Sequence, residues 1–256
     1  MDIFDKYKAI QGVKHKTPDP ENWKFANTSV CKKVYSCFMP SDYSIKSKFP
    51  EVYDQGQHGS CTSNAVLACD DYYYHGVGKS WIPSTIFTYY NQKVLVDKEK
   101  QPLKDNGSSV ESAIKAVKRY GACSAKVWSN EEPFDLKPSD EAYQNGLKGH
   151  EITKYYNIQT LLQLKKALYA NYPVVGAVDW AFRYYDDNYV MNTPTKKEIR
   201  ESNGHAIVFV GYDDSRQVVE FRNSWSNQWA NNGYAYMTYD VLKKIMWWDD
   251  TYAIVR

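Results

Sequence analysis

The chain has 256 residues, of which 43% are hydrophobic, and its 32 Lys and Arg nearly balance its 30 Asp and Glu. This length and apolar fraction predict one large domain or two small lobes, and exclude a disordered chain. The formal net charge of +2 gives no support for a nucleic-acid or membrane-surface partner, because neither sign dominates.

The cysteines and the hydropathy of the chain point to an intracellular protein. Met1 to Lys8 is not followed by an apolar stretch of signal-peptide length, and no run of about 18 apolar residues occurs. The odd number of cysteines leaves at least one thiol free in a monomer, and no Cys-x-x-Cys or Cys/His cluster suggests a zinc site. We therefore expect a reducing compartment, either the cytoplasm or, for a viral protein, the virion or host cytoplasm.

Residues 1–39 are polar and interrupted by Pro18 and Pro20, which predicts an N-terminal extension rather than a domain. The first clear helix is expected to begin at Cys61, capped by Ser60. A second is expected over residues 83–96.

Two further helices have terminal signals. Ser108 and Glu111 are spaced as a capping box, and Gly121 follows as a stop signal. Thr160 and Gln163 open another helix that ends before Pro173.

The last third of the sequence changes to short runs rich in β-branched residues. These runs predict strands over residues 173–179, 206–210, 217–222, 233–238 and 251–255. Helices followed by strands predict an α+β protein, with a mainly helical lobe over residues 40–150 and a β-rich lobe over residues 151–256.

Cys61 is the first candidate for chemistry. A thiol at a helix N-terminus lies beside free backbone N–H groups and the positive end of the helix dipole, and both favour the reactive thiolate. Gln55, six residues earlier, can present its amide NH₂ to a developing oxyanion, with the Cys61 N–H as second donor. The alternative for an isolated cysteine is a buried, inert side chain.

His205 and Asn223 are expected to meet on a β-hairpin. With Tyr212 opposite Arg216 across a three-residue loop, Phe209 faces Val219 and His205 faces Asn223. Side chains directly opposite one another share a face of the sheet, so the amide lies beside the imidazole. Alternatively, His205 is a core histidine and Asn223 a turn residue.

Trp225 and Trp229 follow closely. We expect a tryptophan ring to cover the contact between His205 and Asn223 and to exclude water from it. The alternative is that both rings only pack the second lobe.

Three ordered blocks together resemble papain-like cysteine peptidases: Gln55-Gly-Gln-His-Gly-Ser-Cys61, Gly204-His-Ala206 and Arg222-Asn-Ser-Trp225. The bacterial and viral branch, with Thr after the nucleophile, is the most similar. The resemblance implies a helical left lobe and an antiparallel, β-barrel-like right lobe with the active-site cleft between them. His58 stands where the family usually has a cysteine, so the corresponding disulfide is absent.

The resemblance implies a thiol peptidase that hydrolyses peptide bonds in protein or peptide substrates. Cys61 is the nucleophile, His205 the acid and base, Asn223 the residue that orients His205, and Gln55 an oxyanion donor, with no metal or organic cofactor. Two alternatives remain: a catalytically silent relative that binds peptides or partner proteins, and an acyl transferase using the same Cys–His pair.

The N-terminal extension supports two interpretations. Residues 1–39 form either the inhibitory leader of a zymogen or a structural arm packed against a lobe. The leader contains Cys31 and Cys37, and one of these thiols is a candidate to pair with Cys61.

Overall fold

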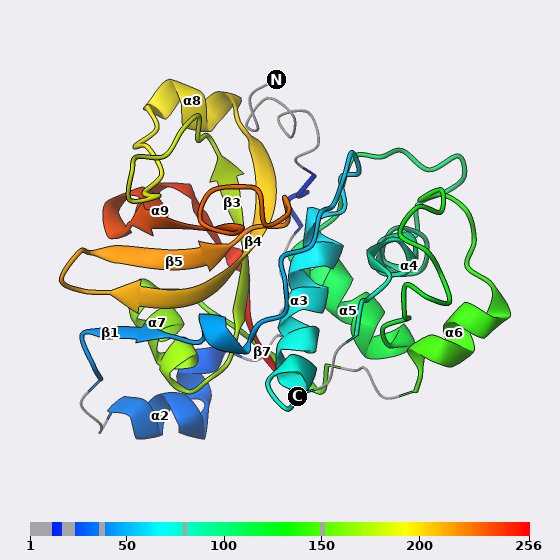
Figure 1. Cartoon of the computed structure of the whole chain (residues 1–256), viewed down its shortest axis with the longest axis horizontal. Coiled ribbons are helices and arrows are strands. Elements are labelled where there is room, and N and C mark those ends of the chain that lie inside the picture. The colour runs from blue at the N-terminus through cyan, green and yellow to red at the C-terminus, as the bar shows by residue number, and fades with distance from the viewer. Residues whose placement is uncertain (1–11, 17–23, 36–38, 79–80, 149–151) are drawn as a thin grey trace.

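The computed structural model describes residues 12–16, 24–35, 39–78, 81–148 and 152–256. Figure 1 shows a sheet on one side of the molecule and a group of helices on the other. The predicted α+β class is confirmed. None of the helices in the described ranges combines the length and hydropathy that a membrane span requires.

The helical lobe is built around α3 (Cys61–His75), which lies between the sheet and the other helices of this lobe (Figure 1). Those helices are α4 (Thr85–Asn91), which continues as the π-helix η3 (Gln92–Val96), then α5 (Val110–Tyr120) and α6 (Asp140–Gly146). All but two of the fifteen residues of α3 are buried, as expected for a helix covered on both sides.

Helix positions agree better with the sequence analysis than helix caps do. The predicted start at Cys61 is confirmed, but the Ser60 hydroxyl makes no capping bond and instead accepts from Asn64 Nδ2 at 3.1 Å. The capping box on Ser108 is also wrong: α5 is capped by Ser109, whose hydroxyl accepts from the Ser112 N–H.

The sheet has seven strands in the order β2-β7-β3-β4-β5-β6, with β1 added against β4, and all pairings between these strands are antiparallel. The strands are β1 (Asp42–Ser44), β2 (Lys154–Asn157), β3 (Val174–Trp180), β4 (Asn203–Asp213), β5 (Val218–Arg222), β6 (Tyr234–Thr238) and β7 (Met246–Val255). Each predicted strand is present. The barrel-like expectation is wrong, because in the described residues no ladder joins β6 to β2 and the sheet stays open.

Shorter helices lie around the sheet. α7 (Leu161–Tyr169) begins as predicted, since Thr160 Oγ1 accepts from the Gln163 N–H. The others are α8 (Lys196–Glu201) and α9 (Tyr239–Ile245), with two short 3₁₀ turns at η1 (Phe25–Asn27) and η2 (Lys46–Lys48).

The predicted β4–β5 register is wrong. Tyr212 pairs with Val219, and a bulge between Phe209 and Gly211 then brings Phe209 opposite Phe221. The connecting loop is one residue longer than expected, and the bulge shifts the register again. Ladder pairing stops at Val208 and Arg222, so His205 and Asn223 are not cross-strand partners.

The described part of the N-terminal extension has two pieces. Residues 24–35, with η1 and α2 (Ser29–Tyr35), pack on the β lobe, where Phe25 and Cys31 are fully buried. Phe25 meets the Tyr156 ring edge-on at 6.4 Å. Residues 12–16 instead lie between the lobes, bridging to Ser108 on one side and Gly204 on the other.

Candidate active site

Cys61 is the first residue of α3, and its side chain is fully buried. Burial raises the pKa of its thiol, while nearby backbone N–H groups of Ala206, Gly12 and Thr62 act in the opposite direction. Ala206 directly follows His205 in β4. The sulfur therefore lies where the head of α3, strand β4 and the N-terminal segment meet.

His205 is bonded to Asn223: His205 Nε2 lies 2.8 Å from Asn223 Oδ1. The same oxygen accepts the backbone N–H of Ser224 at 2.8 Å, which identifies it as the carbonyl oxygen of the amide. Nε2 must therefore donate, and neutral His205 keeps its lone pair on Nδ1. That nitrogen has no hydrogen-bond partner among the described residues, so the structure shows no hydrogen bond between His205 and the Cys61 thiol, and the lone pair on Nδ1 is unused.

Aromatic rings enclose the imidazole. Trp225 lies with its ring centroid 5.1 Å from that of His205, and Trp180 meets His205 edge-on at 4.7 Å. Trp229 packs behind them, 5.7 Å from Trp225. Because this environment is apolar, burial lowers the pKa of His205 to about 4.

Trp180 was missed in the sequence analysis. It ends β3, opposite Asn203 of β4, and so lies two positions from the residue paired with His205. Residues two apart on a strand share a face. The alternation of side chains along β3 could have pointed to Trp180. Using it requires knowing which residue of β3 pairs with His205, and no short turn joins β3 to β4 to fix that register.

Gln55 is fixed beside Asn223. Its Oε1 accepts the Ser224 hydroxyl at 2.6 Å, its backbone N–H donates to Ser224 O at 2.9 Å, and its Nε2 donates to His58 O at 3.0 Å. The amide oxygen thus accepts from Ser224. The amide nitrogen donates one hydrogen to His58 O and has a second hydrogen to donate. This orientation supports the predicted oxyanion role of Gln55, which stays a prediction.

His58 makes a contact that the sequence analysis did not foresee. Its Nδ1 lies 3.2 Å from Asp105 Oδ2, while Asp105 Oδ1 accepts from the Gly59 N–H at 2.9 Å and from the Tyr89 hydroxyl at 2.7 Å. Burial would raise the pKa of Asp105, but these donors outweigh it and hold the pKa below its usual range. His58, at the position where the family usually has a cysteine, is thus linked to Asp105 by a noncovalent contact.

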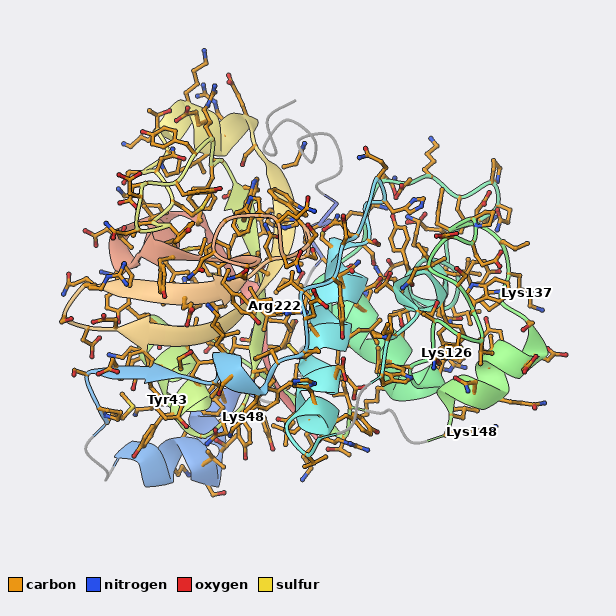
Figure 2. All side chains as sticks on the ribbon, in the orientation of Figure 1. Tyr43, Lys48, Lys126, Lys137, Lys148 and Arg222 are labelled. Atoms are coloured by element: carbon orange, nitrogen blue, oxygen red, sulfur yellow. The ribbon has the colours of Figure 1, made fainter. Side chains whose placement is uncertain are left out.

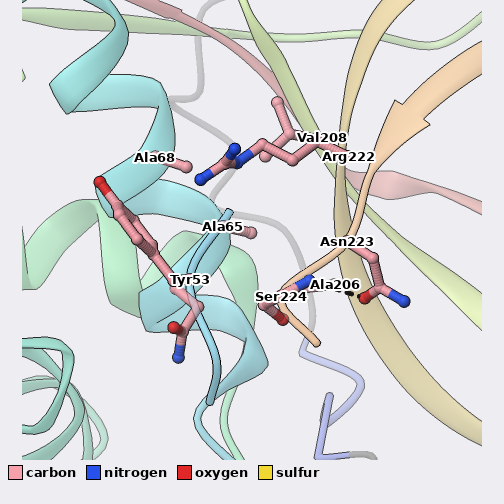
Figure 3. Close-up of a pocket in the computed structure, with 9 residues that line it drawn as sticks. Tyr53, Ala65, Ala68, Ala206, Val208, Arg222, Asn223 and Ser224 are labelled. Atoms are coloured by element: carbon pink, nitrogen blue, oxygen red, sulfur yellow. Dashed lines mark hydrogen bonds between the residues drawn. The ribbon is translucent and has the colours of Figure 1, made fainter. Parts of the chain in front are cut away.

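Arg222 connects the site to the junction of the two lobes (Figure 2). In Figure 3 its side chain extends from β5 toward Ala68 of α3, across a small pocket that Asn223 also lines. The guanidinium is buried and donates to Pro50 O at 2.8 Å and to Glu51 O at 2.7 Å. Arg222 therefore anchors the chain shortly before Gln55.

The N-terminal segment of residues 12–16 crosses the site as an extended strand. The Ser108 N–H donates to Gly12 O at 2.8 Å and the Lys14 N–H to Ser108 O at 3.0 Å, while the Val13 N–H donates to Gly204 O at 3.1 Å. We call residues 12–16 the cleft segment. It joins both lobes over Cys61.

The thiols resolve one expectation. Cys31, Cys61, Cys69 and Cys123 are free and buried. The suggestion that Cys31 pairs with Cys61 is therefore wrong, and the same suggestion for Cys37 falls outside the described residues. Cys69 and Cys123 are buried like Cys61, and burial raises the pKa of each thiol.

A model of the papain family of cysteine proteases matches residues 35–250. The chain belongs to this family. A peptidase C1-like protein of Acanthamoeba polyphaga mimivirus is 31% identical over 73% of the chain and 63% of its own length. Vignain of Vigna mungo is 27% identical over 86% of the chain and 59% of its own length. The chain thus spans about three fifths of these curated relatives.

Papain-family structures share the whole fold. Xylellain, a cysteine protease of Xylella fastidiosa, superposes with a TM-score of 0.79 at 28% identity, covering 97% of each chain. A Carica candamarcensis cysteine protease solved with E-64 has a TM-score of 0.62 at 16% identity, over 85% of this chain and 99% of its own. The papain-like resemblance inferred from the three sequence blocks is confirmed.

Proposed function

We propose that this papain-family chain is a cysteine peptidase that cleaves peptide bonds through an acyl-enzyme on Cys61, and that the cleft segment holds it inactive. The observation that carries the catalytic proposal is the bond from His205 Nε2 to Asn223 Oδ1, because it leaves the Nδ1 lone pair for the thiol. The substrates are proteins or peptides.

The reaction follows from these positions. Nδ1 of His205 takes the Cys61 proton, and the sulfur bonds to the carbonyl carbon while the Cys61 N–H and Gln55 Nε2 bind the oxyanion. The C–N bond then breaks as the imidazolium protonates the leaving amine. His205 next deprotonates a water that attacks the thioester, which releases the acid and restores the thiol.

Cys61→Ala tests the peptidase proposal against a silent relative. The variant should fold like the wild type but hydrolyse no peptide, because no other residue supplies the nucleophile. Cys123→Ala is the matched control and should retain activity. A peptidyl epoxide followed by peptide mapping should modify Cys61 only; hydrolysis by Cys61→Ala would remove the assignment.

Inhibition by the cleft segment is supported by its position. The Gly12 backbone lies against the Cys61 sulfur, Val13 bonds to Gly204 next to His205, and Cys61 has no exposed surface. A carbonyl substrate needs the space that this backbone occupies. Residues 24–35, by contrast, match the structural-arm alternative, since Phe25 and Cys31 belong to the core.

Gly12→Val tests inhibition in the full chain. A Cβ on Gly12 would lie 2.7 Å from Gly59 O and 2.9 Å from Gly107 Cα, closer than side chains pack, so the segment must leave this path. We expect hydrolysis and epoxide labelling to accelerate at least about ten-fold. Lys32→Val, on the exposed side of α2, should change neither rate. Equal rates in all three proteins would remove inhibition and leave the peptidase proposal intact.

A further inference from the structure

We propose that Asp97 and Glu99 form a substrate subsite that selects a Lys or Arg side chain. The subsite lies on the wall of the helical lobe, where η3 ends and the chain leads toward α5. This inference rests on the proposed function, because it requires a peptide to replace the cleft segment.

The chain's own lysines occupy this wall. Lys14 Nζ lies 2.7 Å from Glu99 Oε1. Lys16 Nζ donates to Ser112 Oγ at 3.1 Å and lies 3.7 Å from Asp97 Oδ1. Two ammonium groups on one extended segment thus reach two carboxylates on one wall.

Both carboxylates are held in place by the wall itself. Asp97 accepts hydrogen bonds from the hydroxyls of Ser108 and Ser112. The backbone of Ser108 also pairs with the cleft segment on both sides of Val13. The Asp97 carboxylate therefore lies next to the backbone of Ser108, which pairs with an extended chain. Its position is set by Ser108 and Ser112 and does not depend on Lys14 or Lys16.

Glu99 is held by Lys93. The Lys93 ammonium, fully buried on the π-helix η3, lies 2.9 Å from Glu99 Oε2 and also donates to Asn106 Oδ1 at 2.9 Å and Gly107 O at 3.1 Å. This buried cation fixes Glu99 relative to Gly107 and Ser108. Burial would raise the pKa of Glu99, but Lys14 and Lys93 outweigh it and hold the pKa below its usual range.

The charge balance favours a cation once the cleft segment has left. Glu99 then keeps its buried partner Lys93, whereas Asp97 loses the ammonium group of Lys16 that lies 3.7 Å away. A basic substrate side chain restores the balance, whereas an acidic one faces Asp97 and is repelled. With the cleft segment in place the side chains of Asp97 and Glu99 are 18% and 22% exposed, and a substrate side chain that takes the place of Lys14 or Lys16 would shield them from solvent in the same way.

The test compares peptides that carry Lys, norleucine or Glu at one position at a time, cleaved by full-length wild type and by Gly12→Val. The ratio of kcat/KM between two peptides is independent of the fraction of enzyme whose cleft is open. At one position we expect Lys to be preferred over norleucine by about five- to ten-fold, and Glu to be disfavoured. The preference should weaken as NaCl is added.

In the Gly12→Val background, Asp97→Asn and Glu99→Gln should each reduce this preference, measured as the ratio of kcat/KM between the Lys and norleucine peptides, to about two-fold or less. Glu141→Gln, on the exposed surface of α6, is the matched control and should keep the preference. Glu99→Gln removes the charged partner of the buried Lys93, and the variant could fail to fold for that reason. In that case Asp97→Asn, which leaves Lys93 paired with Glu99, is the test of the subsite. Cleavage without a Lys preference, or a preference that survives Asp97→Asn, would overturn the subsite. Absence of cleavage of every peptide would instead count against the peptidase proposal.

Discussion

At the scale of single residues, burial favours the neutral form of the two groups proposed to react, the Cys61 thiol and the His205 imidazole. Burial raises the pKa of Cys61 and lowers that of His205 to about 4, so desolvation disfavours the charged form of both groups. Because His205 Nε2 donates its hydrogen to Asn223 Oδ1, the lone pair of the neutral ring is on Nδ1, the nitrogen that the proposed mechanism uses as base. With residues 12–16 in place, the structure thus has the His205 tautomer that the proposed mechanism needs, while burial disfavours the thiolate–imidazolium pair.

Asn223→Ala should lower kcat about 100-fold with little change in KM, because the imidazole loses the acceptor that selects its tautomer. Asn223→Asp keeps an acceptor at the same place and should lose less activity, with a raised pKa of His205. Steady-state kinetics over pH 4–9 separate the two effects. An Asn223→Ala variant with wild-type kcat would contradict this role.

The pH dependence of Cys61 alkylation should show whether residues 12–16 cover the thiol. Because the thiol pKa is raised and the His205 pKa is lowered, little thiolate exists at pH 6 in the wild type, and the rate should rise as the pH increases above 8. Gly12→Val admits water and should react faster at pH 6. Iodoacetamide kinetics followed by peptide mapping measure both; identical pH profiles would show that burial does not control the thiol.

At the scale of elements, short polar contacts hold the loops around the head of α3. Asp105 links the loop before Cys61 to the loop before α5 through His58, Gly59 and Tyr89. The link is electrostatic, and it therefore depends on pH in a way that a disulfide does not.

Asp105→Ala should lower the free energy of unfolding by about 2–3 kcal/mol, since it leaves the buried Gly59 N–H and the Tyr89 hydroxyl without acceptors. The folded pKa of Asp105 is lowered, so its contribution is present above the unfolded pKa near 3.9 and is lost as the pH falls below it. Urea unfolding at pH 3 and pH 6 measures this: the variant should differ less from wild type at pH 3.

Element positions were predictable from the sequence because periodicity and stop signals are local. The start of α3 at Cys61 and five of the seven strands could be placed in this way, whereas the short strands β1 and β2 were not predicted. The β4–β5 register could not, since the bulge after Phe209 comes from packing and has no signal in the loop residues.

His205 and Asn223 still meet although the register argument that joined them is wrong. Asn223 lies beyond the last ladder pair, and contacts to Ser224 and Gln55 set its position. The three sequence blocks therefore brought His205 and Asn223 together correctly without the register, while the catalytic roles assigned to the site residues stay predictions. Asp105, 47 residues from His58, and Trp180 depend on tertiary contacts that no local pattern carries.

At the scale of the whole molecule, buried polar residues join the two lobes. Asp250 of β7 accepts the backbone N–H groups of Val110 at 2.9 Å and Glu111 at 3.1 Å, and so caps α5 from the β lobe. Burial raises the pKa of Asp250 to about 7 despite these donors. The junction therefore contains a carboxyl that folding keeps protonated near neutral pH.

The free energy of unfolding should fall by about 2–4 kcal/mol between pH 4.5 and pH 7.5 through Asp250. In this window the folded protein binds a proton that the unfolded chain, with a pKa near 3.9, has already released. Asp250→Asn has no proton to lose and should show a smaller decrease. Urea unfolding at both pH values compares them, and parallel pH profiles would contradict the linkage.

The inhibitor proposed for residues 12–16 is a tethered one, because Phe25 and Cys31 of the neighbouring segment are buried in the β lobe. Once displaced by a substrate, residues 12–16 stay connected to an anchored neighbour, and their effective concentration at the cleft is on the order of millimolar. The proposed inhibition is then a unimolecular equilibrium that dilution does not relieve. A detached peptide with the same sequence would have to be supplied at a similar, millimolar concentration to inhibit equally. Cleavage of the chain between Lys16 and Lys24 should therefore convert the tethered inhibitor into a weak inhibitor that diffuses away.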